Sequence, residues 1–200
     1  MNSKIIESAN RLFMQYGIKS VSFDDIARQS GLSKKDLYSR FANKGDLVNE
    51  LVTKNLEQLD QEFDAITALS IDPLKKIARI YEILLRQQLQ YHPSMYRIMV
   101  RTFPESIKPI DAFQRKLSFT RIPALLDEAK KNKHIKQEIN SEITSELCAW
   151  FMQKMVHGEF YELLQKNFKS TFEMLILYPL QGLLVAEHAH LLNNYSLKQN

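Results

Sequence analysis

The chain has 200 residues, of which 44% are hydrophobic, enough for one large domain or for a small and a larger one. Its single cysteine excludes an internal disulfide and a cysteine-based metal cluster. Only 5 glycines and 6 prolines occur, with no run of alternating β-branched residues, so we expect an all-α protein. No apolar run approaches the roughly 20 residues of a membrane span, and residues 1–25 lack the apolar core of a signal peptide. We therefore expect a cytoplasmic protein that does not contact a membrane.

The net charge of +4 is mildly basic, but it is concentrated in one short segment. Residues 28–45 hold five basic side chains and one acidic one, an excess equal to that of the whole chain. A local basic patch of this kind is the electrostatic footprint of phosphate binding. A solvated helix surface would have the same composition, so the patch alone does not decide between the two interpretations.

Three helices are predicted in the first part of the chain. The first begins near Ser3, carries apolar residues at helical spacing and ends at Gly17, a common type of C-cap. Two shorter helices follow in residues 23–44, joined by a turn at Gly31, because glycine adopts positive φ without steric cost. This arrangement is a compact head of short helices.

Both short helices begin with the signature of a capping box. In this motif a serine side chain and an acid three residues later exchange hydrogen bonds with the backbone. Ser22 and Asp25 have that spacing before the first short helix, and Ser33 and Asp36 have it before the second. We therefore expect both helix starts to be fixed locally.

The second short helix is predicted to have two different sides. Leu37 and Phe41 are four residues apart and form an apolar underside. Its other side and flanks are polar and mainly basic, and they carry Lys34, Lys35, Asp36, Tyr38 and Ser39. A helix of this kind can dock on its domain and insert into a DNA major groove.

A long fourth helix is predicted from about residue 47 to about residue 69, with Asn43 as its cap. Lys44 lies beside the start of this helix, where free N–H groups favour an anion such as a DNA phosphate. An exposed loop lysine is the alternative for Lys44 taken alone. No glycine or proline interrupts the helix further along, so we expect it to connect the head directly with the rest of the chain.

The combined spacing of these features resembles the DNA-binding domain of TetR/AcrR-type transcriptional regulators. The matching residues are Leu12-Phe13 before Gly17, Ser22 ahead of Asp25-Ile26-Ala27, Ser30-Gly31-Leu32-Ser33, Leu37-Tyr38, Phe41, Lys44 and Leu47. The resemblance implies that residues on the second short helix meet DNA and that Tyr38 and Lys44 hold phosphates. The expected DNA-binding set is Ser22, Lys34, Lys35, Asp36, Tyr38, Ser39 and Lys44.

Two positions depart from the family pattern. The family often has glycine at the place of Lys35 and a small serine or threonine at that of Asp36. A carboxylate is repelled by phosphates, so Asp36 is either only a helix cap or an acceptor for a cytosine amino group. We therefore expect a helix-turn-helix DNA-binding domain in residues 1–48 and a larger helical effector-binding and dimerisation domain in residues 49–200.

Beyond residue 70 the pattern predicts helices over about 73–91, 94–103, from Pro109 to 131, 141–167 and 171–193. Pro104 and Pro109 are expected to bracket a loop. Pro123 either kinks its helix or marks a new start, and Pro179 is expected to bend the last helix.

The last two long helices are apolar around more of their girth than a surface helix needs. One face of each can pack on the core and another on a partner subunit, which predicts an interface with a second copy. Burial of every apolar face in the chain's own core explains the same pattern. The resemblance implies a homodimer held together by these two helices.

An apolar effector pocket is plausible in the larger domain. Its candidate lining residues are Tyr81, Met95, Met99, Phe119, Trp150, Met152, His157 and Tyr161. Methionines and aromatic residues at helical spacing are more often plain core, which is the alternative for each of them. No catalytic residues, metal ligands or cofactors are expected, because the histidines are scattered and His188 and His190 face different sides of a helix.

These observations predict a homodimeric transcriptional repressor that binds a palindromic operator in double-stranded DNA and is released by a small apolar or amphipathic effector. An activator or interaction protein with the same fold and no effector is the first alternative. A helical-bundle enzyme is the second, and it would need convergent polar residues that the sequence does not indicate. The effector, the operator and the regulated genes cannot be determined from the sequence.

Overall fold

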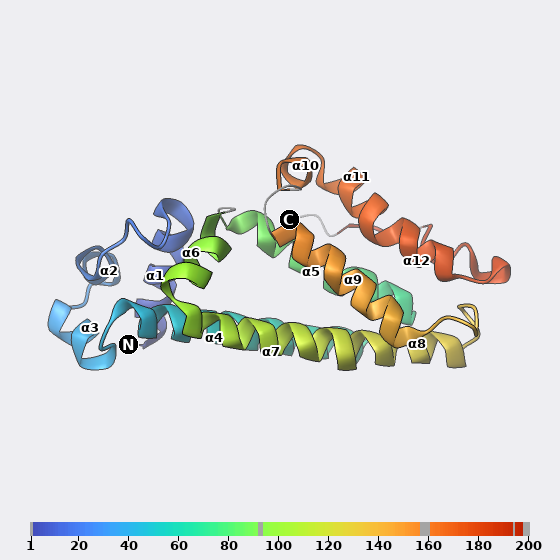
Figure 1. Ribbon diagram of the computed structural model, residues 1–200, viewed down its shortest axis with the longest axis horizontal. Helices are drawn as coiled ribbons and strands as arrows, with labels where there is room; N and C mark the ends of the chain where they lie inside the picture. The colour runs from blue at the N-terminus through green and yellow to red at the C-terminus, as the bar shows by residue number, and fades with distance from the viewer. Residues whose placement is uncertain (1, 92–93, 157–160, 194, 198–200) are drawn as a thin grey trace. The chain divides into compact units, whose positions relative to one another are not determined.

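A computed structural model describes residues 2–91, 94–156, 161–193 and 195–197 of the chain (Figure 1). Within these residues the regular structure is helical, and the one β-type pairing is an isolated bridge between Ile135 and Leu184. The helices are α1 (Asn2–Tyr16), α2 (Phe23–Ser30), α3 (Lys34–Arg40), α4 (Lys44–Thr67), α5 (Pro73–Gln90), α6 (Ser94–Thr102), α7 (Lys108–Lys116), α8 (Ile122–Lys131), α9 (Ser141–Val156), α10 (Tyr161–Lys166), α11 (Phe168–Phe172) and α12 (Tyr178–Leu183). The predicted all-α fold is confirmed.

The chain divides into two compact units. The first consists of residues 1–59 and 90–113, and the second of residues 60–89 and 114–200. Helix α4 therefore contributes residues 44–59 to the first unit and residues 60–67 to the second. The two units are defined by which residues contact one another. The boundary after residue 48 concerns function instead, and it stays a prediction of where the DNA-binding part ends.

The first unit is built around one apolar core. The side chains at its centre are Ile5, Ala9, Phe13, Ile18, Ile26, Leu37, Phe41, Leu47, Val48 and Leu51, together with Met95 and Met99 of α6. Phe103, Ile107 and Ile110 pack against the same core. Helix α6 and the residues after it thus complete the core of the N-terminal helices, although they lie about fifty or more residues further along the chain than the start of α4.

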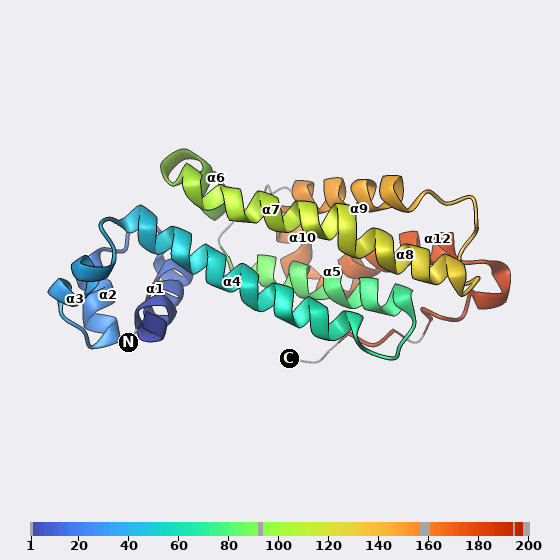
Figure 2. The same cartoon turned by 90° about the horizontal axis from the view of Figure 1, so that it is seen from below.

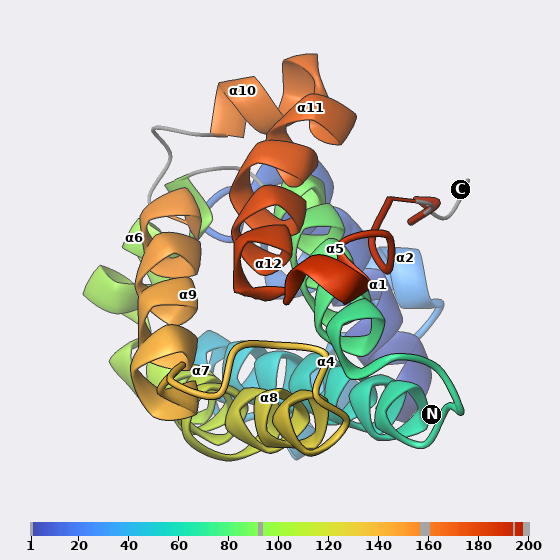
Figure 3. The same cartoon turned by 90° about the vertical axis from the view of Figure 1, so that its right-hand side faces the viewer.

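Helix α5 contributes many of the buried side chains of the second unit. In the end-on view of Figure 3, α5, α8, α9 and α12 surround its interior. The buried side chains there include Phe63, Leu74, Ile77, Tyr81, Leu85, Ile122, Leu126, Leu164, Phe172 and Ile176. Helix α9 contacts α8 and the turn at Leu117–Arg121 that precedes it (Figure 2), and the Ser145 hydroxyl donates to the carbonyl of Ser118 at 2.6 Å.

Two prolines are preceded by a π-helical turn. Leu117–Arg121 is π-helical ahead of Pro123, and Glu173–Leu177 is π-helical ahead of Pro179. Proline supplies no N–H to the carbonyl four residues earlier and its ring crowds that carbonyl, whereas a π-turn shifts the preceding bonds to i→i−5. The N–H of Ile122 accordingly bonds the carbonyl of Leu117. The helical backbone therefore continues past Pro123 and past Pro179.

Two predictions about helix extent were wrong. The segment expected as a loop is helical, with a 3₁₀ turn at Pro104–Ile107 and Pro109 in the first turn of α7, where the missing N–H costs nothing. The last helix ends at Leu183 rather than near residue 193. Leu184 is extended and pairs with Ile135, and the N–H of Val185 donates to His134 at 3.0 Å. Backbone bonds to a distant segment end the helix there.

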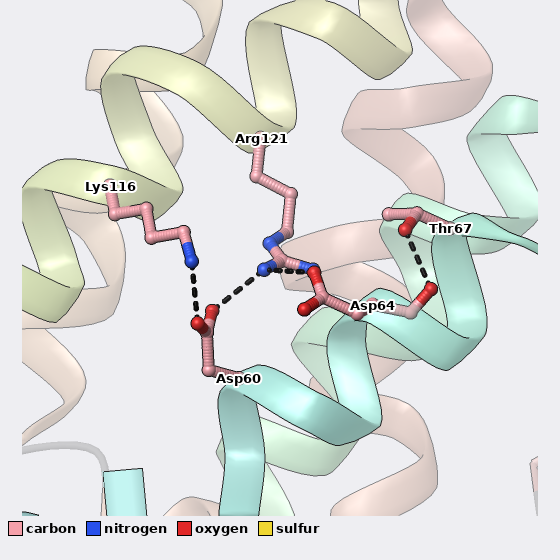
Figure 4. Close-up of polar contacts among 5 residues, drawn as sticks. All are labelled: Asp60, Asp64, Thr67, Lys116 and Arg121. Carbon is pink, nitrogen blue, oxygen red and sulfur yellow. Dashed lines mark hydrogen bonds and ion pairs between the residues drawn. The ribbon is translucent and has the colours of Figure 1, made fainter. Parts of the chain in front are cut away.

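A buried arginine fastens the end of α4 to the π-turn (Figure 4). The Arg121 guanidinium lies 2.7 Å from Asp60 Oδ1 and 2.8 Å from Asp64 Oδ1, and its side chain is 7% exposed. Lys116 also reaches Asp60, at 2.5 Å. These four side chains belong to the second unit, so residues 60–67 of α4 are held by charge as well as by packing.

The described residues offer neither a membrane-spanning helix nor a cluster of metal ligands. None of the helices there combines the length and the apolar character that crossing a bilayer requires. No group of three or more histidine, cysteine, aspartate or glutamate side chains in these residues is placed to hold a metal ion.

Candidate nucleic-acid interface

Helices α2 and α3 are joined by a three-residue turn that the sequence makes easy to form. Gly31 adopts a left-handed conformation, with φ 70° and ψ 23°, which costs glycine little. Its N–H and that of Leu32 both donate to the carbonyl of Ala27, which closes the end of α2. Leu37 and the C-cap residue Phe41 are buried in the core beneath, so α3 presents its other side to solvent.

Both predicted capping boxes are present. The Ser22 hydroxyl accepts from the N–H of Asp25 at 3.2 Å, and Asp25 accepts from the Ser22 N–H at 2.9 Å. Ser33 and Asp36 repeat this pattern at 3.1 and 2.9 Å. Hydrogen bonds from the capping serine, first through its side chain, lower the pKa of Asp25 and of Asp36 below the usual range. The Asp36 carboxylate is thus engaged in the cap, which favours the cap interpretation over cytosine recognition.

The basic side chains at the start of α3 differ in their contacts. Lys34 forms an ion pair with Asp24 in the first turn of α2, and both side chains are about half exposed. Lys35 is exposed to solvent beside Asp36. The surface made by Asp24, Lys34, Lys35, Tyr38 and Lys44 is called the α2–α3 surface below.

Tyr38 and Ser39 lie further along α3. The Tyr38 side chain is 59% exposed, and its ring packs 5.0 Å from the ring of the buried Phe23. That contact holds the ring on the surface of the unit. The Ser39 hydroxyl donates to the carbonyl of Asp36 at 2.8 Å, so it bonds its own helix.

Lys44 is the first residue of α4 and is half buried. Its ammonium donates to the carbonyl of Val21 at 2.5 Å and lies 5.8 Å from the centre of the Phe13 ring. Burial lowers the pKa of Lys44, and the charge of Asp25 partly opposes this. The start of α4 is capped by Asn43, whose side-chain oxygen accepts from the N–H of Asp46 at 3.0 Å, as the sequence predicts.

Three charged residues of this region were not in the predicted set. Asp24 pairs with Lys34 from another helix, a contact that no local spacing indicates. Arg28 and Arg40 are exposed in the last turns of α2 and α3, and they were counted in the basic segment without a role of their own. Their positive charge within a short basic segment was the one feature of the sequence that could have indicated a role in DNA binding.

The predicted pocket residues are distributed over both units. Met95 and Met99 belong to the core of the first unit. In the second unit Tyr81 is buried, and this burial raises the pKa of its hydroxyl well above the ordinary value. Phe119 and Trp150 are exposed. Met152 is partly buried, and the Tyr161 hydroxyl donates to the carbonyl of Leu89 at 3.3 Å. His157 lies outside the described residues. The effector pocket stays a prediction.

The second unit exposes apolar side chains on two helical segments. On α9 they recur at i, i+4, i+7 and i+8, the spacing of one helix face, and they are Ile143, Leu147, Trp150 and Phe151. Met174 and Tyr178 are exposed four residues apart in the last helical segment. Each of these side chains is more than half exposed. We call this set the exposed apolar face.

Comparison with known proteins matches the N-terminal helices to the family that their sequence resembles. Residues 5–51 match the family model of bacterial regulatory proteins, tetR family. The chain is 33% identical over 60 residues to the uncharacterized HTH-type transcriptional regulator YhgD of Bacillus subtilis, covering 30% of this chain and 31% of YhgD. It is 34% identical over 79 residues to the HTH-type transcriptional regulator AcrR of Shigella flexneri, covering 38% of this chain and 36% of AcrR. The chain thus spans about a third of the length of these curated relatives.

The fold is similar over nearly the whole chain to a solved transcriptional regulator from Cytophaga hutchinsonii. That structure aligns with a TM-score of 0.71 and 22% sequence identity over 90% of this chain and 97% of the other. The relatives named here are transcriptional regulators, in keeping with the expectation that the chain is not an enzyme.

Proposed function

We propose that the chain is a homodimeric DNA-binding transcriptional regulator, because residues 5–51 match the family model of bacterial regulatory proteins, tetR family. More specifically, it is a repressor that leaves a palindromic operator when a small apolar or amphipathic effector binds the second unit. The main support for DNA binding is the α2–α3 surface. There, the capped helix α3 buries Leu37 in the core and exposes lysines and Tyr38 to solvent.

The chemistry of this surface supports contact with duplex DNA. A helix that inserts into the major groove reads base edges, while neighbouring lysines and tyrosines bind phosphates. Lys35 and Ser39 lie on the exposed side of α3. Tyr38 and Lys34 lie on the same short helix, within reach of a backbone that follows the groove. The expected DNA contacts therefore remain Ser22, Lys34, Lys35, Asp36, Tyr38, Ser39 and Lys44, with Ser22 and Asp36 acting through the caps.

The exposed apolar face supports pairing with a second copy. Large apolar side chains that are exposed together on one helix face of a soluble protein commonly mark a protein–protein contact. A twofold symmetric dimer would place two α2–α3 surfaces on two half-sites of one operator, so palindromic DNA is the expected partner. The proposed dimer uses α9 and the segment from Phe168 to Leu183.

DNA binding is tested by gel shift with a palindromic duplex taken from beside the gene for this chain. The wild-type protein is expected to shift the duplex at low salt. A Lys34→Ala/Tyr38→Ala/Lys44→Ala variant is expected to bind at least about tenfold more weakly, because it loses three phosphate contacts on each subunit.

The matched control is Lys4→Ala/Tyr16→Ala/Lys54→Ala, which changes the same residue types in the first unit outside α2 and α3. It is expected to bind as the wild type does, with far-UV circular dichroism confirming that both variants are folded. Equal binding by the two triple variants would refute the assigned surface.

The effector is tested separately. A ligand that binds only the folded state raises the melting temperature by mass action. Apolar and amphipathic compounds are screened by thermal shift, and a hit is expected to weaken the gel shift, because it favours the conformation with lower operator affinity. A protein that binds DNA but is stabilised by none of these compounds would fit an activator or interaction protein without an effector.

A further inference from the structure

We propose that Asp24 limits the DNA affinity of the α2–α3 surface by competing with DNA phosphate for the ammonium group of Lys34. This inference rests on the proposed DNA-binding function and adds a residue that lowers affinity rather than raising it. The contact that carries it is the ion pair between Asp24 Oδ2 and Lys34 Nζ, which joins the first turn of α2 to the first turn of α3.

The two neighbouring acids in α2 have different roles. Asp25 accepts hydrogen bonds from both the N–H and the hydroxyl of Ser22, at 2.9 and 2.6 Å, and these bonds fix the start of α2. Asp24 has its carboxylate on Lys34 instead. Asparagine at position 24 would therefore remove the ion pair and leave the capping box of α2 in place.

The other lysines of the surface are held differently. The Lys44 ammonium donates to the uncharged carbonyl of Val21, and the charge of Asp25 acts on it without an ion pair, so no carboxylate has to leave Lys44 when a phosphate binds. Lys35 is exposed beside Asp36, whose carboxylate is engaged by Ser33. At Lys34 alone among the three predicted lysine contacts, a carboxylate from another helix occupies the ammonium. A phosphate that binds Lys34 must displace this carboxylate and then lies close to its negative charge.

Salt dependence provides a second signature. Salt weakens lysine–phosphate contacts and so lowers DNA affinity, but it also screens an exposed ion pair such as Asp24–Lys34. In the wild-type protein the second effect partly offsets the first, because added salt frees Lys34 as it weakens the phosphate contact. Removing the Asp24 charge is therefore expected to make the salt dependence of binding steeper.

The test measures binding to a random-sequence duplex of about 30 base pairs at several salt concentrations, because phosphate contacts do not depend on sequence. Asp24→Asn is expected to raise affinity roughly threefold to fivefold at low salt, the range open to an exposed ion pair. In a Lys34→Ala background the same substitution is expected to give less than about half of that increase in log affinity. The Lys34 ammonium is then absent, so removing the Asp24 charge frees no lysine for a phosphate.

Glu105→Gln is the matched control, since Glu105 is another exposed acid of the first unit with a lysine partner, Lys108, outside α2 and α3. It is expected to leave affinity and salt dependence unchanged. Thermal melting shows whether Asp24→Asn remains folded. Unchanged or weaker binding by folded Asp24→Asn would overturn the inference, and weaker binding would assign Asp24 to positioning Lys34.

An equal increase with and without Lys34 would also overturn it, because the effect would then be a general one of net charge. These outcomes are distinct from failure of the proposed function. If the wild-type protein ignores every duplex at low salt, both proposals fail. If it binds and Asp24→Asn changes nothing, only this inference fails.

Discussion

Asp36 in α3 shows how the role of one side chain depends on its nearest neighbours. Its carboxylate accepts from both the N–H and the hydroxyl of Ser33, at 2.9 and 2.6 Å, while its own N–H donates to the Ser33 hydroxyl. These bonds favour the ionised carboxylate and lower its pKa. An acid on a DNA-binding helix is therefore compatible with the proposed function, because it holds the start of that helix.

The capping role of Asp36 predicts a dependence of stability on pH. Since the pKa is lower in the folded than in the unfolded state, the carboxylate stabilises the fold above the unfolded-state pKa of about 3.9 and loses this effect as pH falls through the folded-state pKa. Asp36→Asn is expected to reduce the fall in urea-unfolding free energy between about pH 5 and about pH 2. Glu57→Gln, at an exposed position on α4, is the control. A fall as steep in Asp36→Asn as in the wild type would contradict the capping role.

At the scale of the helix, α4 is the element shared by the two units. Its residues 44–59 pack in the first and its residues 60–67 in the second, without an interrupting glycine or proline after Gly45. The second part is held by Arg121, which the π-turn before Pro123 presents to Asp60 and Asp64 (Figure 4). The position of α4 in the second unit thus depends on a charge contact with a segment about sixty residues away.

The two carboxylates around Arg121 are expected to contribute unequally. Asp60 is 28% exposed and contacts both Lys116 and Arg121, whereas Asp64 is 68% exposed. Asp60→Ala should lower the unfolding free energy by about 1–3 kcal/mol, because a buried guanidinium loses its better-shielded partner. Asp64→Ala should cost less than about 1 kcal/mol, since solvent screens an exposed pair. Urea titrations of the two variants check this order, and an equal or larger loss in Asp64→Ala would contradict it.

For the molecule as a whole, the exposed apolar face is the strongest indication of an assembly larger than one chain. Ile143, Leu147, Trp150 and Phe151 follow one side of α9 and are each more than half exposed. Leaving so much apolar area in water is unfavourable, and a partner surface would remove it from water. The proposed twofold dimer satisfies this requirement and supplies two α2–α3 surfaces for a palindrome.

Introducing a charge into this face tests the dimer. Leu147→Glu is expected to convert the protein to a monomer in sedimentation velocity and to weaken operator binding, because each half-site is then bound independently. Leu69→Glu is the matched control, since Leu69 is exposed outside the face. A wild-type monomer, or a dimer that survives Leu147→Glu with its affinity unchanged, would rule out this interface.

The sequence by itself determined the parts of the molecule that depend on near neighbours. The turn at Gly31, both capping boxes and the start of α4 after Asn43 were all predicted, because each is fixed by contacts three to five residues apart. The candidate DNA-binding residues on α3 were open to prediction for the same reason. Helix spacing decides which side chains share a face with Leu37.

Only the tertiary structure decided which distant segments meet. The ion pair of Asp24 with Lys34, the packing of Met95 and Met99 into the first unit, and the end of the last helix at Leu183 all depend on such contacts. A hydrophobic pattern predicts that a side chain is buried, but it does not predict which helix that side chain packs against. In the same way, a charged residue in the sequence does not indicate which residue it pairs with. Those choices follow from the packing of the whole fold, because burial and charge pairing act between any groups that it brings together.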